Sequence, residues 1–225
     1  VMFENWLKVL PTLIQPTWNS TVIAVGSALL LLIIMTPCAY VFVWHRFPGK
    51  ERLFAIAIAT LLMPSVLTFV PLYIQVRDLG LLNTKWAMIL PTIAGGVAVS
   101  LFLLRAFFSA LPADLVEAAR IDGASEIQIL GRIIIPLATP GLITVAVLII
   151  SNAWNQYLWP LVALTAKSER VATVAAVFWS SDPFTNTSVP VLMSAYLLSS
   201  LPLIIILAIL LKYFMAGSLG GALKG

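Results

Sequence analysis

The chain has 225 residues, of which 61% are hydrophobic and only 10% are charged, and its mean hydropathy is +1.04. Ordinary globular domains have about 25% charged and about 45–50% apolar residues, so this composition excludes disorder, a disulfide scaffold and an ordinary cytosolic enzyme. The net charge of +4 comes from scattered lysines and arginines without a basic cluster, which is typical of membrane edges and argues against nucleic-acid binding.

Five long uncharged stretches follow one another along the chain, and four of them run for 24, 19, 34 and 29 residues. A helix that rises about 1.5 Å per residue needs about 20 apolar residues to cross about 30 Å of hydrocarbon. The stretches are continuously apolar rather than alternating, which excludes the strands of a membrane barrel. The sequence therefore predicts an all-α polytopic membrane helix bundle, with spans near residues 20–44, 53–76, 86–106, 137–160 and 190–213.

Two of these spans contain residues that predict irregularities. The first uncharged stretch opens with Pro11, Pro16 and Asn19, so its membrane span is expected to begin only near residue 20. The second contains Pro64 and Pro71, which are expected to bend it.

The lysines and arginines between the spans predict the orientation in the membrane. Eight lie on the side that holds the loop 107–132 and the C-terminus, and five lie on the other side. The positive-inside rule therefore places this loop and the C-terminus in the cytoplasm. Five spans then leave Val1 outside with no signal segment before it. We expect six spans in all, the first of them missing from this chain.

The cytoplasmic loop 107–132 is expected to lie in water, because a charge at the bilayer centre costs about 2.5–3.5 kcal/mol and seven of the 22 charges lie between Arg105 and Arg132. It also contains the signals of two short helices. Pro112 suits a first helical turn, and Gly123 is typical of a residue just after a helix. Ser125 and the glutamine three residues later match a capping box, which opens a second helix. The loop is thus predicted to be two helices with a glycine corner.

The first of these helices has a surface suited to another protein. Ala119 and Gly123 lie four residues apart on one face, so a partner can approach closely, and Glu117 and Asp122 supply carboxylates beside them. The alternative is a solvated hairpin that only links two spans. The residues by themselves leave both interpretations open.

An ordered set of motifs resembles one known family. Glu117-Ala118-Ala119 with Gly123 and Ile135-Pro136 looks like the EAA loop of binding-protein-dependent ABC importer permeases. Gly80–Thr84 resembles the family's extracellular turn, Trp154–Pro160 its Trp-Asn-(Asp/Gln)-aromatic-Leu-Trp-Pro segment, and Tyr213–Gly225 its C-terminal ending. The resemblance covers nearly the whole chain and is closest to the maltose-type second permease of the carbohydrate-uptake branch.

The resemblance implies that residues 1–225 form a single type I ABC importer transmembrane domain, with five visible spans of an expected six. It implies a permease subunit, not an enzyme, that moves a sugar or sugar-like solute by alternating access. No cofactor is expected, since partner subunits bind the ATP. The implied partners are a second homologous permease, two cytoplasmic ATP-binding subunits, an extracellular or periplasmic solute-binding protein and membrane lipid, without nucleic acid. The implied location is the bacterial or archaeal cell (inner) membrane, crossed several times.

The resemblance also assigns roles to residues of the loop. The helix over 112–124 is expected to be a coupling helix that sits in a groove of the ATPase subunit. The residues expected to couple to the ATPase are Glu117, Ala118, Ala119, Asp122, Gly123 and Ala124. Glu117 would anchor by polar contacts and the small residues would pack closely, while Asp122 would make a second polar contact or only cap its helix. The tail 217–225 would reach the ATPase or be a frayed end.

Polar residues within a span are candidates for the solute pathway. The richest set is Asn152, Asn155, Gln156 and Tyr157, flanked by Trp154 and Trp159. Amides can bind sugar hydroxyls and aromatic rings can stack on sugar faces, but the same residues could instead hold helices together. Trp159 could also belong to an interfacial aromatic belt.

Two further interpretations concern the outer face and the energy source. Residues 167–189, with Trp179, Ser180, Asp182, Pro183 and Phe184, are too polar to span, and in the family such a region faces the solute-binding protein. An ion-coupled secondary transporter is the alternative function, but it should bury an acidic residue at the midplane. All nine acidic residues fall in loops or at predicted membrane edges.

Overall fold

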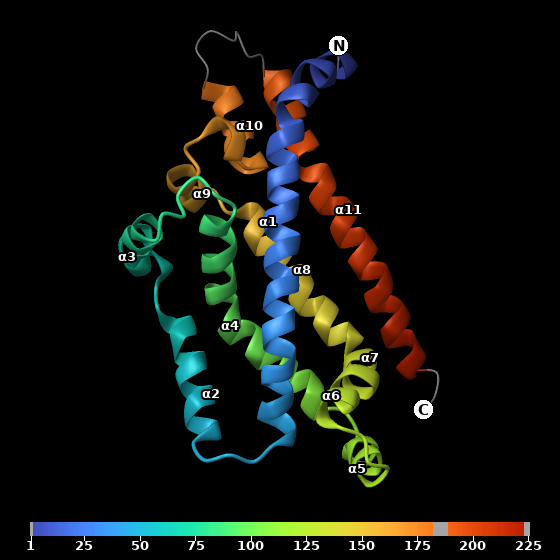
Figure 1. The fold of residues 1–225 in the computed structure, drawn as a ribbon. Coiled ribbons are helices and arrows are strands. Elements are labelled where there is room, and N and C mark those ends of the chain that lie inside the picture. Colours follow the sequence, from blue (N-terminus) through green and yellow to red (C-terminus); the bar gives the residue numbers. More distant parts are fainter. Residues whose placement is uncertain (1, 182–188, 223–225) are drawn as a thin grey trace. The chain divides into compact units, whose positions relative to one another are not determined.

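A computed structural model describes residues 2–181 and 189–222, which form helices and contain no strand (Figure 1). This confirms the predicted all-α class. The first half contains α1 (Met2–Trp44), α2 (Lys50–Ala59), η1 (Thr60–Leu62), α3 (Ser65–Asp78), α4 (Trp86–Ser109) and α5 (Ala113–Ile121). The second half contains α6 (Glu126–Ile129), the π-helical turn η2 (Leu130–Ile134), α7 (Ile135–Leu137), α8 (Thr139–Asn155), α9 (Leu158–Ala163), η3 (Lys167–Glu169), α10 (Ala172–Ser181) and α11 (Val189–Ala222).

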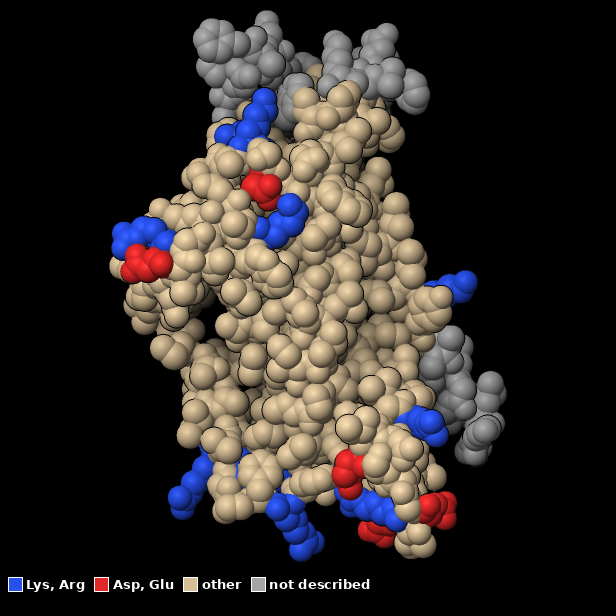
Figure 2. Space-filling view, in the orientation of Figure 1, with Lys and Arg blue, Asp and Glu red and all other residues tan. Residues whose placement is uncertain are grey.

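Within the described ranges, three segments are long and apolar enough to cross a membrane unbroken: Val9–Trp44, Trp86–Ser109 and Met193–Met215. Two interrupted pairs, Lys50–Leu62 with Ser65–Asp78 and Glu126–Leu137 with Thr139–Asn155, raise the number to five if each pair is one span. Charged groups on the face drawn in Figure 2 are few and occur in small separate groups, as expected for such a chain.

The chain divides into two compact units. Unit 1 comprises Val1–Ser27, Ser65–Ala94 and Ile149–Ala208, and unit 2 comprises Ala28–Pro64, Gly95–Leu148 and Ile209–Gly225. The helices α1, α4, α8 and α11 each contribute to both units.

The opening of α1 is helical rather than turn-rich, so the helix begins at Met2, well before residue 20, near which the membrane span is expected to begin. The helix continues through Pro11 and Pro16. Asn19 is completely buried, and its amide donates hydrogen bonds to the carbonyl oxygens of Ser168 (2.8 Å) and Arg170 (3.1 Å). A buried amide is tolerated where its hydrogen bonds are satisfied, so this polar residue lies inside the helix without breaking it.

The second predicted span is interrupted at one of its two prolines. Met63 has extended backbone angles (φ −76°, ψ 122°) directly before Pro64. A proline disfavours the helical conformation of the preceding residue, which explains the break. Pro71, by contrast, lies inside α3 without interrupting it.

Each unit has its own tightly packed contacts. In unit 1, the apolar residues Val9 and Leu13 of α1 pack with Ala175 and Ala195. In unit 2, α4 and α8 approach so closely that a methyl group at Gly141 would lie 2.5 Å from Cγ of Phe107. Only glycine therefore fits at position 141 without movement of the Phe107 ring.

Candidate functional site

The helix α5 begins and ends where its sequence predicts. Pro112 is the N-cap residue with extended backbone angles (φ −60°, ψ 123°), and Asp114 lies in the first turn. At the other end, Gly123 has φ +80°, in the left-handed region that favours glycine. Its N–H donates to Arg120 O (3.1 Å), and the N–H of Ala124 donates to Ala119 O (2.9 Å). These two bonds form a Schellman motif, which confirms the predicted glycine corner.

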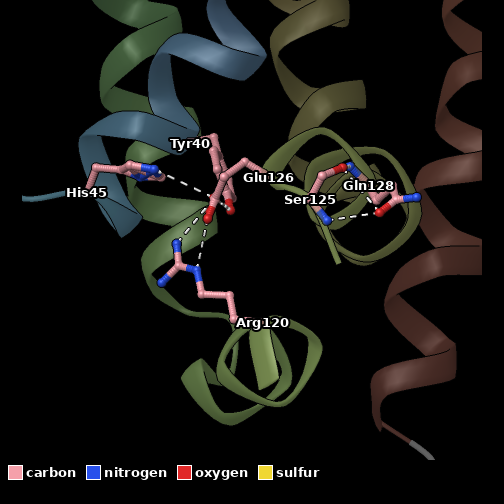
Figure 3. A network of polar contacts seen from close by, with 6 residues as sticks. All are labelled: Tyr40, His45, Arg120, Ser125, Glu126 and Gln128. Atoms are coloured by element: carbon pink, nitrogen blue, oxygen red, sulfur yellow. Dashed lines mark hydrogen bonds and ion pairs between the residues drawn. The ribbon is translucent and has the colours of Figure 1, made fainter. Parts of the chain in front are cut away.

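The capping box after this corner is also confirmed. Ser125 Oγ accepts a hydrogen bond from the backbone N–H of Gln128 (3.4 Å), and Gln128 Oε1 accepts one from the backbone N–H of Ser125 (2.9 Å) (Figure 3). The box satisfies two N–H groups that an uncapped helix would leave without partners. It therefore fixes the start of α6 immediately after α5.

The residues expected to couple to an ATPase lie mostly on the surface of α5 and its corner. Glu117, Ala118, Asp122 and Gly123 are exposed, and the remaining two, Ala119 and Ala124, are half-buried. Within the described part of the chain, the carboxylates of Glu117 and Asp122 form no side-chain hydrogen bond or ion pair. Asp122 occupies the C-cap position, but its side chain does not cap α5. Both carboxylates are therefore available to a partner.

Apolar side chains accompany these carboxylates, and the sequence analysis missed them. Leu115, Ile121 and Ile127 are 44%, 86% and 83% exposed, whereas Val116 is buried and fixes the opposite side of α5. Large apolar side chains that stay exposed in a segment assigned to water are typical of contact sites for other proteins. The sequence alone indicates that these apolar residues are unusual, because they lie in a loop that its charges place in water.

A polar network surrounds Glu126, the first residue of α6, within unit 2 (Figure 3). Arg120 donates two hydrogen bonds to its carboxylate, from Nε to Oε1 (3.0 Å) and from Nη2 to Oε2 (3.2 Å). The hydroxyl of Tyr40 in α1 donates to Oε2, and Nε2 of His45 lies 3.6 Å from the same oxygen. The Arg120 guanidinium and then the Tyr40 hydroxyl lower the pKa of the Glu126 carboxyl. Nothing local in the sequence predicts this network, because Tyr40 is 86 residues away.

A second ion pair in unit 2 joins α4 to α2. Arg105 donates from Nη1 to Glu51 Oε2 (3.0 Å) and from Nη2 to Glu51 Oε1 (2.7 Å). The same guanidinium lies over the ring of Phe54, 4.2 Å from its centroid. This bidentate geometry is the strongest that an arginine and a carboxylate can form.

The candidate pathway residues lie in unit 1, where α8 and the turn after it share them. The helix α8 ends at Asn155, and the next two residues, Gln156 and Tyr157, are not helical. The hydroxyl of Thr173 donates a hydrogen bond to the backbone carbonyl oxygen of Gln156 (2.8 Å). This bond satisfies a backbone carbonyl where the helix stops.

Only part of this set is free to meet a solute. Asn155 donates to Ser151 O in its own helix (2.8 Å). Gln156 Nε2 donates to Asn152 Oδ1 (3.2 Å) and to Thr92 Oγ1 of α4 (3.4 Å), as the helix-joining alternative expects. Asn152, Asn155 and Tyr157 are exposed, and Gln156 is half-buried.

The two tryptophans beside this set are buried. Trp154 is 4% and Trp159 is 7% exposed. The indole N–H of Trp159 donates to Ala87 O (2.9 Å), and Phe69 packs edge-on against its ring. Trp159 is thus a packing residue of unit 1 rather than part of an interfacial belt.

Polar bonds also fasten the segment before α10 in unit 1. Asn83 has φ +59°, and its side-chain oxygen accepts from the N–H of Ala166 (2.7 Å) and from the hydroxyl of Thr165 (3.1 Å). Lys85 forms an ion pair with Glu169 (3.1 Å). The sequence motif around Asn83 is therefore a turn that holds a distant loop.

Some predicted residues lie outside the described ranges. Asp182, Pro183 and Phe184 of the expected binding-protein face belong to this group, as do residues 223–225 of the tail. The rest of the tail continues α11 as far as Ala222. Among the described residues, no group of three or more His, Cys, Asp or Glu side chains could hold a metal ion.

Comparisons with known proteins agree with the motif analysis. The family model described as binding-protein-dependent transport system inner membrane component matches residues 36–217. A probable ABC transporter permease of Pyrococcus horikoshii, PH1036, is 34% identical over 206 residues, covering 92% of this chain and 74% of the relative. The trehalose transport system permease SugB of Mycobacterium tuberculosis is 33% identical over 208 residues, covering 92% of this chain and 76% of the relative.

A solved structure shares the same fold. It is a crystal structure of a bacterial ABC transporter involved in the import of the acidic polysaccharide alginate. The match has a TM-score of 0.75 at 28% identity and covers 94% of this chain and 79% of that chain. The ion-coupled alternative finds no support in these comparisons, since the matched proteins are ABC transporter components.

Proposed function

Because this chain belongs to the family of binding-protein-dependent transport system inner membrane components, we propose that the solute it moves is a sugar or a sugar-like compound. The chain is a multi-pass membrane permease of an ABC importer, a transport component rather than an enzyme. The solute class is supported by the trehalose permease and the alginate transporter among the similar proteins. Uptake assays with trehalose, a longer oligosaccharide and an amino acid would test it, and uptake of the amino acid alone would contradict it.

ABC importer permeases work with ATPase and solute-binding partners. For this chain we propose a complex with a second homologous permease and two ATP-binding subunits. Alternating access in such a complex would be driven by the ATPase pair. Native mass spectrometry of the purified complex would test these subunit counts.

We propose that α5 and the corner after it form the coupling site for an ATPase subunit, and that this site and the C-terminus are cytoplasmic. The observation that carries this proposal is the surface of α5, where the carboxylates of Glu117 and Asp122 are unpaired and the apolar side chains of Leu115 and Ile121 are exposed. Free carboxylates suit an arginine or lysine of the partner, and the apolar side chains suit a groove. The Schellman corner at Gly123 keeps this surface in one shape.

The test of the coupling site is assembly with the ATPase subunit. We expect the double variant Glu117→Ala, Gly123→Leu to lose ATPase co-purification, because it removes an anchoring carboxylate and places a side chain at φ +80°. Asp78→Ala is the matched control, since Asp78 is an exposed acid that only pairs with Arg77 (2.8 Å). If the double variant bound the ATPase and supported uptake like the unmodified chain, the coupling site would be assigned wrongly.

For the solute pathway we propose Asn152 and Tyr157 as contact residues, with Asn155 and Gln156 holding their surroundings in place. This division follows from the hydrogen bonds: Asn155 is exposed like Asn152 and Tyr157, but its amide and that of Gln156 donate to groups of unit 1. We expect Asn152→Ala to raise the KM for uptake while ATPase assembly is retained. An unchanged KM would contradict the contact role.

A further inference from the structure

Glu126 joins two parts of unit 2 that the chain itself connects only through a long path. Its carboxylate accepts two hydrogen bonds from Arg120 in the last turn of α5 and one from Tyr40 near the end of α1. The chain between Tyr40 and Glu126 is 86 residues long. No short stretch of chain ties α1 to the α5 region, so the contact between them at Tyr40 and Glu126 is made by side chains.

The α5 side of this junction is rigid. Arg120 precedes the corner at Gly123 and Glu126 follows it. The two hydrogen bonds between their side chains therefore hold the two ends of the corner together. Charge-assisted bonds in a bidentate arrangement are about twice as strong as neutral ones and fix orientation. We therefore expect a displacement of α5 to carry the Glu126 carboxylate with it.

The α1 side is rigid as well. Tyr40 is 3% exposed, so its hydroxyl needs a partner, and Glu126 supplies that partner. The imidazole of His45 packs edge-on against the Tyr40 ring at a centroid distance of 5.7 Å and lies 3.6 Å from the same carboxylate. Figure 3 shows Tyr40 of α1, His45 just after α1 and Arg120 of α5 converging on Glu126.

We propose that Glu126 is a positioning residue that makes the end of α1 move together with α5 when the ATPase acts. This inference rests on the proposed role of α5 as the coupling helix. The chain also links α5 to α4 directly through residues 110–112, so α4 can follow α5 without any side chain. The helix α1 has no such short connection to α5, and the Tyr40–Glu126 hydrogen bond links the two instead.

Tyr40→Phe separates this role from a purely local one. The variant removes the hydroxyl that bonds Glu126 and keeps the ring that packs on His45. The Arg120–Glu126 pair is untouched, so the corner after α5 keeps its shape. A local role of Glu126 in closing the corner predicts no effect of Tyr40→Phe on α1, whereas the positioning role predicts a clear one.

Cys38, the single cysteine of the chain, reports on α1 two residues before Tyr40. The experiment uses the complete complex with its ATPase subunits in nanodiscs, N-ethylmaleimide as the probe, and mass spectrometry to follow Cys38 labelling with and without ATP and vanadate. In the unmodified complex we expect trapping to change the labelling rate. In Tyr40→Phe we expect this change to shrink about fivefold or more, the scale of typical coupling between sites, while ATPase association and hydrolysis persist.

Glu126→Gln should reduce the trapping-dependent change in Cys38 labelling at least as much as Tyr40→Phe does. Combining Tyr40→Phe with Glu126→Gln should reduce it little further. Tyr73→Phe is the matched control, because the Tyr73 hydroxyl makes no hydrogen bond to a described residue, and we expect it to behave as the unmodified complex. An unchanged response in Tyr40→Phe, or no response of Cys38 in an active unmodified complex, would overturn the positioning role alone. If instead the Glu117→Ala, Gly123→Leu variant still bound the ATPase, the coupling site would fail, and this inference with it.

Discussion

Tyr40 in α1 and Glu126 at the start of α6 are joined by a hydrogen bond although 86 residues separate them in the chain. Arg120 completes the junction from α5, so one carboxylate meets side chains of two other helices. The hydrogen-bond donors around it consist of a guanidinium and a phenol, which both favour the ionised carboxylate. The stability of this junction therefore depends on pH, on charge and on one hydroxyl group.

We expect acid to weaken the junction. The folded-state pKa of Glu126 is lowered from its ordinary value of 4.5, by Arg120 first and Tyr40 second. The ionised carboxylate therefore stabilises the fold above pH 4.5, and its contribution is lost as pH falls below 4.5 and through the lowered folded-state pKa. Thermal unfolding in detergent from about pH 7 to about pH 3.5 should show a smaller acid loss of Tm in Glu126→Gln than in the unmodified chain. Equal losses in both proteins would contradict the assignment.

The Arg105–Glu51 pair should contribute only modestly to stability. Its bidentate geometry is favourable, but the Glu51 side chain is 68% exposed, so water screens the attraction. We expect Arg105→Lys to lower the stability only slightly, since lysine lacks the planar fork that matches a carboxylate but the exposed pair is already screened by water. Denaturation of the purified chain in detergent measures this, and a large loss of stability would mean that Arg105 has another role.

Removing the Trp159 indole N–H should cost more. In Trp159→Phe the Ala87 carbonyl loses its buried hydrogen bond, and the smaller ring leaves space beside Phe69. We expect a loss of about 1–3 kcal/mol in the free energy of unfolding. Trp86→Phe is the matched control, because Trp86 is 49% exposed and should tolerate the change. Similar effects at both positions would show that the bond to Ala87 contributes little.

The turn at Asn83 should distinguish backbone conformation from side-chain bonding. Asn83→Gly permits φ +59° but removes the oxygen that accepts from Ala166 and Thr165, whereas Asn83→Ala loses both features. We therefore expect Asn83→Ala to be less stable than Asn83→Gly by about 1 kcal/mol. Thermal melts of the two variants side by side measure the difference. The opposite order would exclude a strained backbone at this position.

Local signals in the sequence predicted the α5 region well. Gly123 and the pair Ser125 and Gln128 act on backbone groups within a few residues, so their positions alone indicate a corner and a capping box. Pro64 acts on its direct neighbour in the same way, and the helix is interrupted there. Pro71 did not interrupt its helix, which continues through it to Asp78.

Features that depend on distant residues could not be predicted. The amide of Asn19 looked like a turn signal, because its partners, the carbonyls of Ser168 and Arg170, lie about 150 residues further along. Tyr40 carries no sign in the sequence that it meets Glu126. The end of α8 at Asn155 could not be predicted for the same reason, since the hydroxyl that donates to the next carbonyl, that of Gln156, belongs to Thr173.

The most direct test of the coupling site is a cross-link from α5 to the ATPase. Ala118 is exposed on α5 between the other proposed contact residues, so Ala118→Cys in a Cys38→Ser background places one thiol at the site. Ser168→Cys, also exposed but in unit 1, is the matched control. With a short thiol-to-amine cross-linker on the intact complex, we predict a product with the ATPase subunit from Ala118→Cys and none from Ser168→Cys. An assembled, active complex in which Ala118→Cys gives no such product would contradict the coupling role of α5.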